Sequence, residues 1–174
     1  MDPLRFIAGY PPEVTEQAVR LLEAGELGRA IAQRYPERHE VRSSRALHDY
    51  VHELKARYLK KAPPLRRVLY DDSLQVVEGA LGLHVTRRQV QGSKLRTRRE
   101  LRVAGLFQDA PADFLRMICV HELAHLKHDD HDRDFYRLCT YMEPDYHRLE
   151  LDLRLYLVQL EWPGAASGSP GAEV

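Results

Sequence analysis

Residues 114–131 read FLRMICVHELAHLKHDDH, an apolar run that ends in several histidines and a glutamate. A helix advances about 100° and about 1.5 Å per residue, so His121 and His125 would lie one turn apart on one face, with Glu122 beside His121. The apolar residues around them are typical of a helix that is buried on nearly all sides. Buried imidazoles and carboxylates need partners, and this spacing favours a metal ion between the two histidines.

The pentapeptide HELAH at residues 121–125 has the H-E-x-x-H pattern. In a catalytic zinc site the protein supplies three ligands and water takes the fourth position. A glutamate next to the first histidine can accept a proton from that water. The pattern therefore predicts a zinc-dependent hydrolase in which His121 and His125 bind Zn²⁺ and Glu122 is the catalytic general base.

The third zinc ligand has to come from outside the pentapeptide. On a continuing helix, His128 would lie about 10 Å along the axis from His121, which is awkward for one small ion. Residues 127–130 are polar, and aspartates favour caps and turns, so we expect the helix to break there and a new helix to begin near Asp132. His131 could then return toward the first two histidines, and it is the predicted third ligand.

Other polar residues remain as alternatives for the roles around the ion. Two carboxylates could replace the third histidine as a distant ligand, in the order Glu143, Glu150. Three aspartates could orient an imidazole through its other nitrogen or could simply be solvated, namely Asp129, Asp130 and Asp134. A donor that stabilises an oxyanion is also needed, and the residues eligible by type are His128, Tyr136, Tyr141, Tyr146 and His147.

The stretch from Ala110 to Phe135, APADFLRMICVHELAHLKHDDHDRDF, resembles the YgjP-like metallopeptidase domain, a relative of the SprT-like and WLM proteases. In that family a helix begun by proline carries HELxHL, the third zinc histidine follows after five residues, and an aromatic pair comes next. The matching positions here are His121, Glu122, His125, Leu126, His131, Phe135 and Tyr136. The similarity continues through Pro144-Asp145-Tyr146 and covers roughly the second half of the chain.

This resemblance implies a zinc metallopeptidase that hydrolyses peptide bonds in a peptide or protein substrate. It also implies that an edge strand, here Glu100 to Phe107, pairs with the extended substrate backbone. The competing hypothesis is a nucleic-acid-associated or adaptor protein with a structural zinc site. An intact Glu122 favours the enzyme, because a structural site needs no base at that position.

Helical and extended patterns alternate along the chain in a way that indicates an α+β fold. Helices are expected over Glu13 to Gln33 with a turn at Gly25 and Gly28, over Leu47 to Tyr58 behind a cap at Ser43 or Ser44, from Pro111 through the motif, and over Asp132 to Met142 and Tyr146 to Leu160. Extended segments are expected at Arg67 to Tyr70, Leu83 to Val90 and Glu100 to Phe107. We therefore predict N-terminal helices, a small mainly antiparallel sheet, the HExxH helix and C-terminal helices, as in a minimal zincin-like metallopeptidase.

Composition suggests how these elements are organised and where the protein works. The predicted ranges are a helical N-terminal region over 1–62, the metallopeptidase domain over 63–162 and a disordered tail over 163–174, which is rich in Gly, Ala, Ser and Pro. Two cysteines, Cys119 and Cys139, make no disulfide framework, which favours a reducing compartment. The start of the chain lacks a signal-peptide pattern and no apolar run reaches the length of a membrane span, so we expect a cytoplasmic protein without a membrane partner.

A net charge of zero conceals a basic stretch from Arg87 to Arg102. This stretch carries seven basic residues against one acid, Glu100, a local balance of +6. It could bind nucleic acid through phosphates in a salt-dependent way. We favour a solvated hairpin whose arginines pair with acids from the acidic C-terminal half, so nucleic acid is a possible partner but not the expected one.

Overall fold

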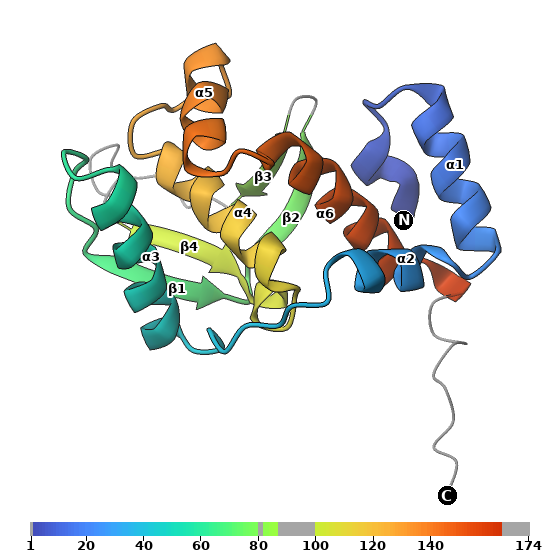
Figure 1. The fold of residues 1–174 in the computed structure, drawn as a ribbon, viewed down its shortest axis with the longest axis horizontal. Helices are drawn as coiled ribbons and strands as arrows, with labels where there is room; N and C mark the ends of the chain where they lie inside the picture. Colours follow the sequence, from blue (N-terminus) through green and yellow to red (C-terminus); the bar gives the residue numbers. More distant parts are fainter. Residues whose placement is uncertain (1, 80–81, 87–99, 165–174) are drawn as a thin grey trace, which may run out of the picture. The chain divides into compact units, whose positions relative to one another are not determined.

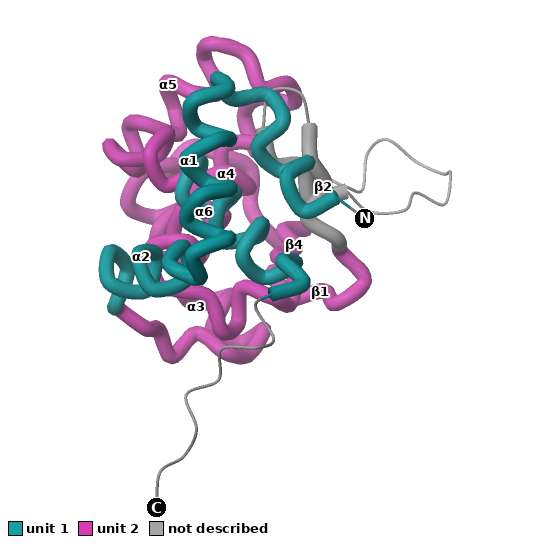
Figure 2. The backbone as a smooth tube through the Cα atoms, turned by 90° about the vertical axis from the view of Figure 1, so that its right-hand side faces the viewer, with its two compact units in different colours: residues 1–36, 150–174 teal, residues 37–149 magenta. Residues whose placement is uncertain are grey.

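A computed structural model describes residues 2–79, 82–86 and 100–164 (Figure 1). The contacts between residues divide the chain into two compact units, which Figure 2 draws in teal and magenta. The first comprises residues 1–36 and 150–174, and the second comprises residues 37–149. Every residue predicted for the metal site lies in the second unit, apart from the alternative ligand Glu150.

The first unit is helical. A short 3-10 helix, Pro3–Ile7, precedes α1 (Pro12–Glu23) and α2 (Leu27–Arg34), and the unit is completed by the part of α6 (Tyr146–Glu161) that follows residue 149. Gly25, with φ of 68°, forms the turn between α1 and α2, a conformation that side chains other than glycine rarely adopt. The predicted helix, turn and helix are thus present, but the turn is at Gly25 and not at Gly28, which lies within α2.

A buried carboxylate joins α2 to α6 inside the first unit. The hydroxyl of Tyr35 donates to Asp152 Oδ2 at 2.5 Å, and Arg34 Nη1 lies 3.1 Å from the same oxygen. Asp152 is only 5% exposed, so these two donors supply the partners that a buried charge requires.

The second unit contains two small sheets and most of the remaining helices. Its elements are α3 (Ser44–Tyr58), β1 (Arg67–Asp71), β2 (Gln75–Gly79), β3 (Gly82–Thr86), β4 (Glu100–Ala104), α4 (Ala112–Ala124) and α5 (Arg133–Met142). β2 and β3 form an antiparallel hairpin, whereas β1 and β4 run parallel, with Arg67 opposite Glu100 and Asp71 opposite Ala104. The α+β expectation holds for these elements.

The prediction of a mainly antiparallel sheet is wrong for β1 and β4. A parallel pair needs a long connection that returns the chain to the same end of the sheet, and residues 72–99 provide one here. Alternation of polar and apolar residues has the same period in parallel and antiparallel strands. The sequence pattern therefore identified the strands but not their relative direction.

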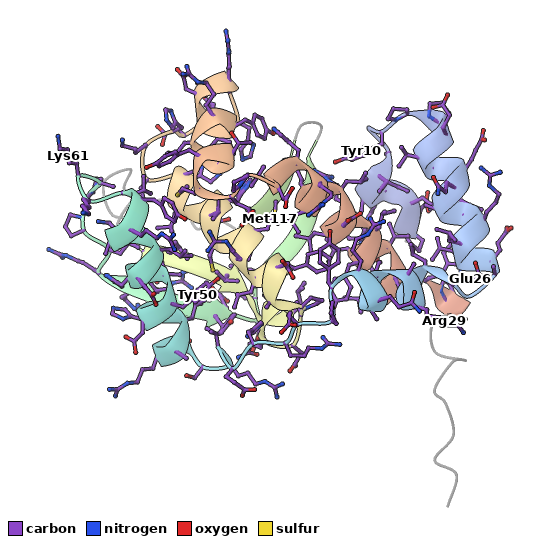
Figure 3. The ribbon with its side chains drawn as sticks, viewed as in Figure 1. Tyr10, Glu26, Arg29, Tyr50, Lys61 and Met117 are labelled. Carbon is purple, nitrogen blue, oxygen red and sulfur yellow. The ribbon has the colours of Figure 1, made fainter. Side chains whose placement is uncertain are left out.

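Helices α3 and α4 cover the β1–β4 sheet (Figure 1). Val68 and Tyr70 on β1 stand opposite Leu101 and Val103 on β4, and all four are buried, so they occupy one face of the sheet. α3 packs on β1 and α4 packs on β4. Met117 of α4, labelled in Figure 3, is fully buried in this core.

The strand predicted over Glu100 to Phe107 is shorter than expected. β4 ends at Ala104, and residues Gly105–Gln108 form a 3-10 helix. A Cβ at Gly105 would overlap the carboxylate of the exposed Asp72, so a larger residue there would require that side chain to move. The chain then reaches Pro111 and the start of α4.

Several predictions concern residues outside the described ranges. These are residues 87–99 of the basic stretch, which include the end of the predicted strand Leu83 to Val90, and residues 165–174 of the predicted tail. The domain ranges 1–62, 63–162 and 163–174 stay a prediction, since the two compact units are defined by contacts alone. Among the described residues, no helix is long and apolar enough to cross a membrane.

Candidate metal centre

The last turn of α4 carries the first part of the centre. α4 begins after Pro111, with Asp113 in its first turn, where the positive end of the helix dipole favours an acid. His121 is 1% exposed, and His125 is the C-terminal cap residue, whose backbone N–H donates to the carbonyl of His121 at 3.4 Å. The i, i+4 spacing thus brings two imidazoles to one face, as predicted.

The helical conformation ends after α4 and resumes at α5, and the interruption lies in the polar segment where the sequence predicted it. The backbone N–H groups of Lys127 and His128 donate to the carbonyl of Ala124 at 3.0 and 3.1 Å, which closes the end of the helix. Asp132 then caps α5, its carboxylate accepting from the backbone N–H of Phe135 at 2.8 Å. His131 directly precedes this cap and returns to the two histidines of α4.

Three imidazole nitrogens converge at this point. His121 Nε2 lies 3.3 Å from His125 Nε2 and 3.2 Å from His131 Nε2, and the last two atoms are 3.0 Å apart. A tetrahedral zinc ion bonded to each nitrogen at about 2.0–2.1 Å would hold its ligands about 3.3 Å apart. The cluster therefore has the dimensions of a metal site, with one buried and two partly exposed histidines.

The outer nitrogens of two rings support the same conclusion. His125 Nδ1 lies 2.9 Å from the backbone carbonyl of His128, which can only accept, so Nδ1 carries the proton and Nε2 presents a lone pair. His121 Nδ1 lies 2.6 Å from the hydroxyl of Tyr146, a residue that is fully buried. The Tyr146 hydroxyl can donate or accept, so it orients the ring of His121 without selecting its tautomer. The lone pair of His125 Nε2 faces the other two Nε2 atoms, an arrangement that fits a metal ion between the three rings.

Phe135 forms an apolar floor beneath the cluster. Its ring is fully buried, and its centroid lies 5.1 Å from that of His121, 4.7 Å from that of His125 and 4.6 Å from that of His131. Contacts on this side limit the rotation of all three imidazoles. A restrained set of ligands loses little conformational entropy when an ion binds.

Glu122 is adjacent to His121 in the last turn of α4. Its side chain is partly exposed, and desolvation of the carboxyl group raises its pKa to about 8. A cation held by the neighbouring histidines would favour the ionised form and so oppose this shift. Glu122 thus follows His121 in the chain, and burial favours the protonated form of its carboxyl group.

The alternative ligands have other partners in the part of the chain that the structure describes. His128 contributes its backbone carbonyl to His125 and is not part of the cluster. Glu143 pairs with Arg116, with 2.5 Å between Oε2 and Nε, and Glu150 lies 3.4 Å from Arg154. His131 is therefore the residue that the structure brings to the first two histidines.

Two groups that orient the histidines are not identifiable as such from the sequence. Asp130 is exposed and Asp134 lies 3.5 Å from Arg137, whereas the orienting role of Asp129 stays a prediction. The observed partners are the Tyr146 hydroxyl and a main-chain carbonyl. Tyr146 was considered only as an oxyanion donor, and a carbonyl partner leaves no trace in residue identities.

Two sets of basic residues in the second unit lie apart from the histidine cluster and bear on the nucleic-acid hypothesis. Arg102, the only described basic residue of the predicted basic stretch, pairs with Asp71 and Glu100. A shallow hollow of about 340 Å³ contains none of the clustered histidines and is lined by Ser44, Arg45, His48, Arg66, Arg67, Val68 and Leu69. The partners of Arg102 are not acids of the C-terminal half, and the hypothesis of a solvated hairpin stays a prediction for residues 87–99, which lie outside the described ranges.

A three-histidine cluster beside a glutamate, at the end of a buried helix, defines a candidate metal-dependent hydrolase. The sequence model of the YgjP-like family, described as a metallopeptidase domain, matches residues 24–156. The chain belongs to this YgjP-like family. It is also 47% identical over 160 residues to the UTP pyrophosphatase of Escherichia coli (strain K12), covering 92% of this chain and 96% of that protein. No solved structure matches the chain.

Proposed function

We propose that this protein is a zinc-dependent hydrolase that cleaves a nucleoside triphosphate to a nucleoside monophosphate and pyrophosphate. His121, His125 and His131 hold the ion, and Glu122 is the general base. The convergence of three Nε2 atoms within 3.0–3.3 Å carries the metal-dependent part of this proposal. The near full-length similarity to a UTP pyrophosphatase supports the choice of substrate.

The reaction requires an activated water and a stabilised phosphate. Zinc, when bound by the three histidines, would lower the pKa of a bound water and provide positive charge next to the phosphate oxygens. Glu122 accepts a proton from the attacking water, whose oxygen forms a bond to the α-phosphorus. The bond between that phosphorus and the bridging oxygen breaks, and pyrophosphate leaves with the bonding electrons. The His128 carbonyl keeps His125 in the tautomer that presents Nε2, and the Tyr146 hydroxyl holds the ring of His121 in place through Nδ1.

A second candidate is peptide-bond hydrolysis in a peptide or protein substrate. The H-E-x-x-H pattern and the description of the family favour it. The same histidines and Glu122 would act, with Glu122 also passing the proton to the leaving amine. Nucleic-acid binding and an adaptor role with a structural zinc site stay less favoured predictions, because a structural site does not need Glu122.

Substrate identity is tested by incubating the zinc-loaded protein separately with UTP and with an unfolded protein such as casein. We expect UMP and pyrophosphate in equal amounts, no orthophosphate, and intact casein. Glu122→Gln protein prepared in the same way controls for contaminating enzymes. Cleavage of casein without release of pyrophosphate would replace the first candidate by the second.

The Tyr146 hydroxyl is expected to contribute to metal affinity. Tyr146→Phe removes the partner of His121 Nδ1 but keeps the buried ring, so the imidazole loses its orienting bond without loss of packing. Outer partners of metal-bound histidines contribute about 10-fold to 100-fold in metal affinity. Competition with a chromophoric chelator should show a loss of this size. Tyr141→Phe, at an exposed tyrosine on α5, is the matched control, and equal affinities in both variants would reject the role of Tyr146.

A further inference from the structure

Aromatic side chains extend from the metal cluster along α5 and the start of α6. Tyr136 lies next to the cluster, with its ring centroid 6.3 Å from that of His131. On its other side it lies 5.4 Å from His147, at an interplanar angle of 38°. The three rings of His131, Tyr136 and His147 thus form a continuous row that begins at a candidate metal ligand.

The members of this aromatic group differ in exposure. Phe135 and Tyr146 are fully buried and contact His121, so they belong to the support of the metal site. Tyr136 is partly exposed and His147 is exposed. Adjacent residues on a helix point about 100° apart, so Phe135 can pack beneath the histidines while Tyr136 lies beside them. The outer two rings therefore offer aromatic surface to a ligand next to the cluster.

Two properties of this surface match a nucleotide, namely its position next to the metal cluster and its aromatic rings. In a nucleoside triphosphate only the ribose separates the α-phosphate from the base, so attack at the α-phosphorus brings the base close to the ion. Bases stack on tyrosine and histidine rings, and stacking tolerates different bases because each has a π-face. A peptide backbone, although each of its amide groups is planar, carries no aromatic base.

We propose that Tyr136 and His147 form a stacking platform for the base of the nucleoside triphosphate. This inference rests on the proposed function and goes beyond it, since it assigns base binding to residues that neither hold the ion nor move the proton. The platform would discriminate nucleotides from other polyphosphates rather than one base from another. Tyr136 and His147 are accordingly binding residues.

The test compares two ligands that differ only in the base, UMP and ribose 5-phosphate, on zinc-loaded protein by titration calorimetry. Tyr136→Ala removes the ring, Tyr136→Leu removes the π-face but keeps side-chain bulk, and Tyr136→Phe keeps the face. Tyr141→Ala is the matched control, because Tyr141 is on the same helix and 64% exposed. Zinc content and thermal unfolding of each variant establish that the fold and the cluster persist.

We expect the unchanged protein to hydrolyse UTP and to bind UMP at least about tenfold more tightly than ribose 5-phosphate. Tyr136→Ala and Tyr136→Leu should lose this preference, while Tyr136→Phe and Tyr141→Ala should keep it. UTP hydrolysis with an unchanged preference for UMP in Tyr136→Ala and Tyr136→Leu would overturn the platform and leave the proposed function in place. Failure of the unchanged protein to hydrolyse UTP would overturn the proposed function itself, and the platform with it.

Discussion

Glu122→Gln is expected to lower the rate of UTP hydrolysis by about a hundredfold to ten-thousandfold, the usual contribution of a positioned general base. The amide has nearly the shape of the carboxylate but cannot accept the proton of the attacking water. Folding and zinc content should be unchanged, because Glu122 is not part of the histidine cluster. Pyrophosphate release at saturating UTP measures the effect.

The matched control for this substitution is Glu53→Gln, at an exposed glutamate on α3. That change removes one carboxylate of the same type at a distance in sequence from the candidate centre, and it should leave the rate unchanged. A rate for Glu122→Gln within a few-fold of the unchanged protein would reject Glu122 as the base. Casein cleavage by the same proteins would report on the same residue if the second candidate function were correct.

His131→Ala is expected to reduce zinc from about one ion per chain to near zero after dialysis. The substitution removes one of three converging Nε2 atoms, and two imidazoles alone leave the ion half coordinated. The fold should persist, since His131 is partly exposed and the cap at Asp132 that begins α5 is retained. Metal analysis of the dialysed protein gives the stoichiometry.

His128→Ala is the control for the loss of His131. It removes the competing imidazole but keeps the backbone carbonyl that accepts from His125 Nδ1. Zinc content in this variant should equal that of the unchanged protein. Loss of zinc from His128→Ala together with full retention by His131→Ala would transfer the third ligand position to His128.

The peptidase motif and a pyrophosphatase activity are chemically compatible. A water activated by a metal ion and a carboxylate can attack either a carbonyl carbon or a phosphorus, because the ion stabilises negative charge on the oxygens of both. What differs is how the rest of the substrate is held. The choice between the two substrates therefore depends on neighbours of the cluster such as Tyr136 and His147.

Local sequence signals determined much of the candidate centre. The i, i+4 spacing places His121 and His125 on one helix face, because it depends only on helix geometry. The polar run after Leu126 and the capping preference of Asp132 predicted the break and the start of α5, which bring His131 back. Both features depend on residues that are close together in the chain. The choice of His131 also depended on the family resemblance.

Only the tertiary structure decided the features that join distant parts of the chain. Tyr146 meets His121 across 25 residues. The parallel direction of β1 and β4 is likewise a pairing between strands that are far apart in the chain. Periodicity and capping act within one element, whereas these contacts arise when elements pack together. The sequence by itself therefore determined the helix that carries His121 and His125 and the start of the helix that follows His131. Packing decided which groups support these histidines.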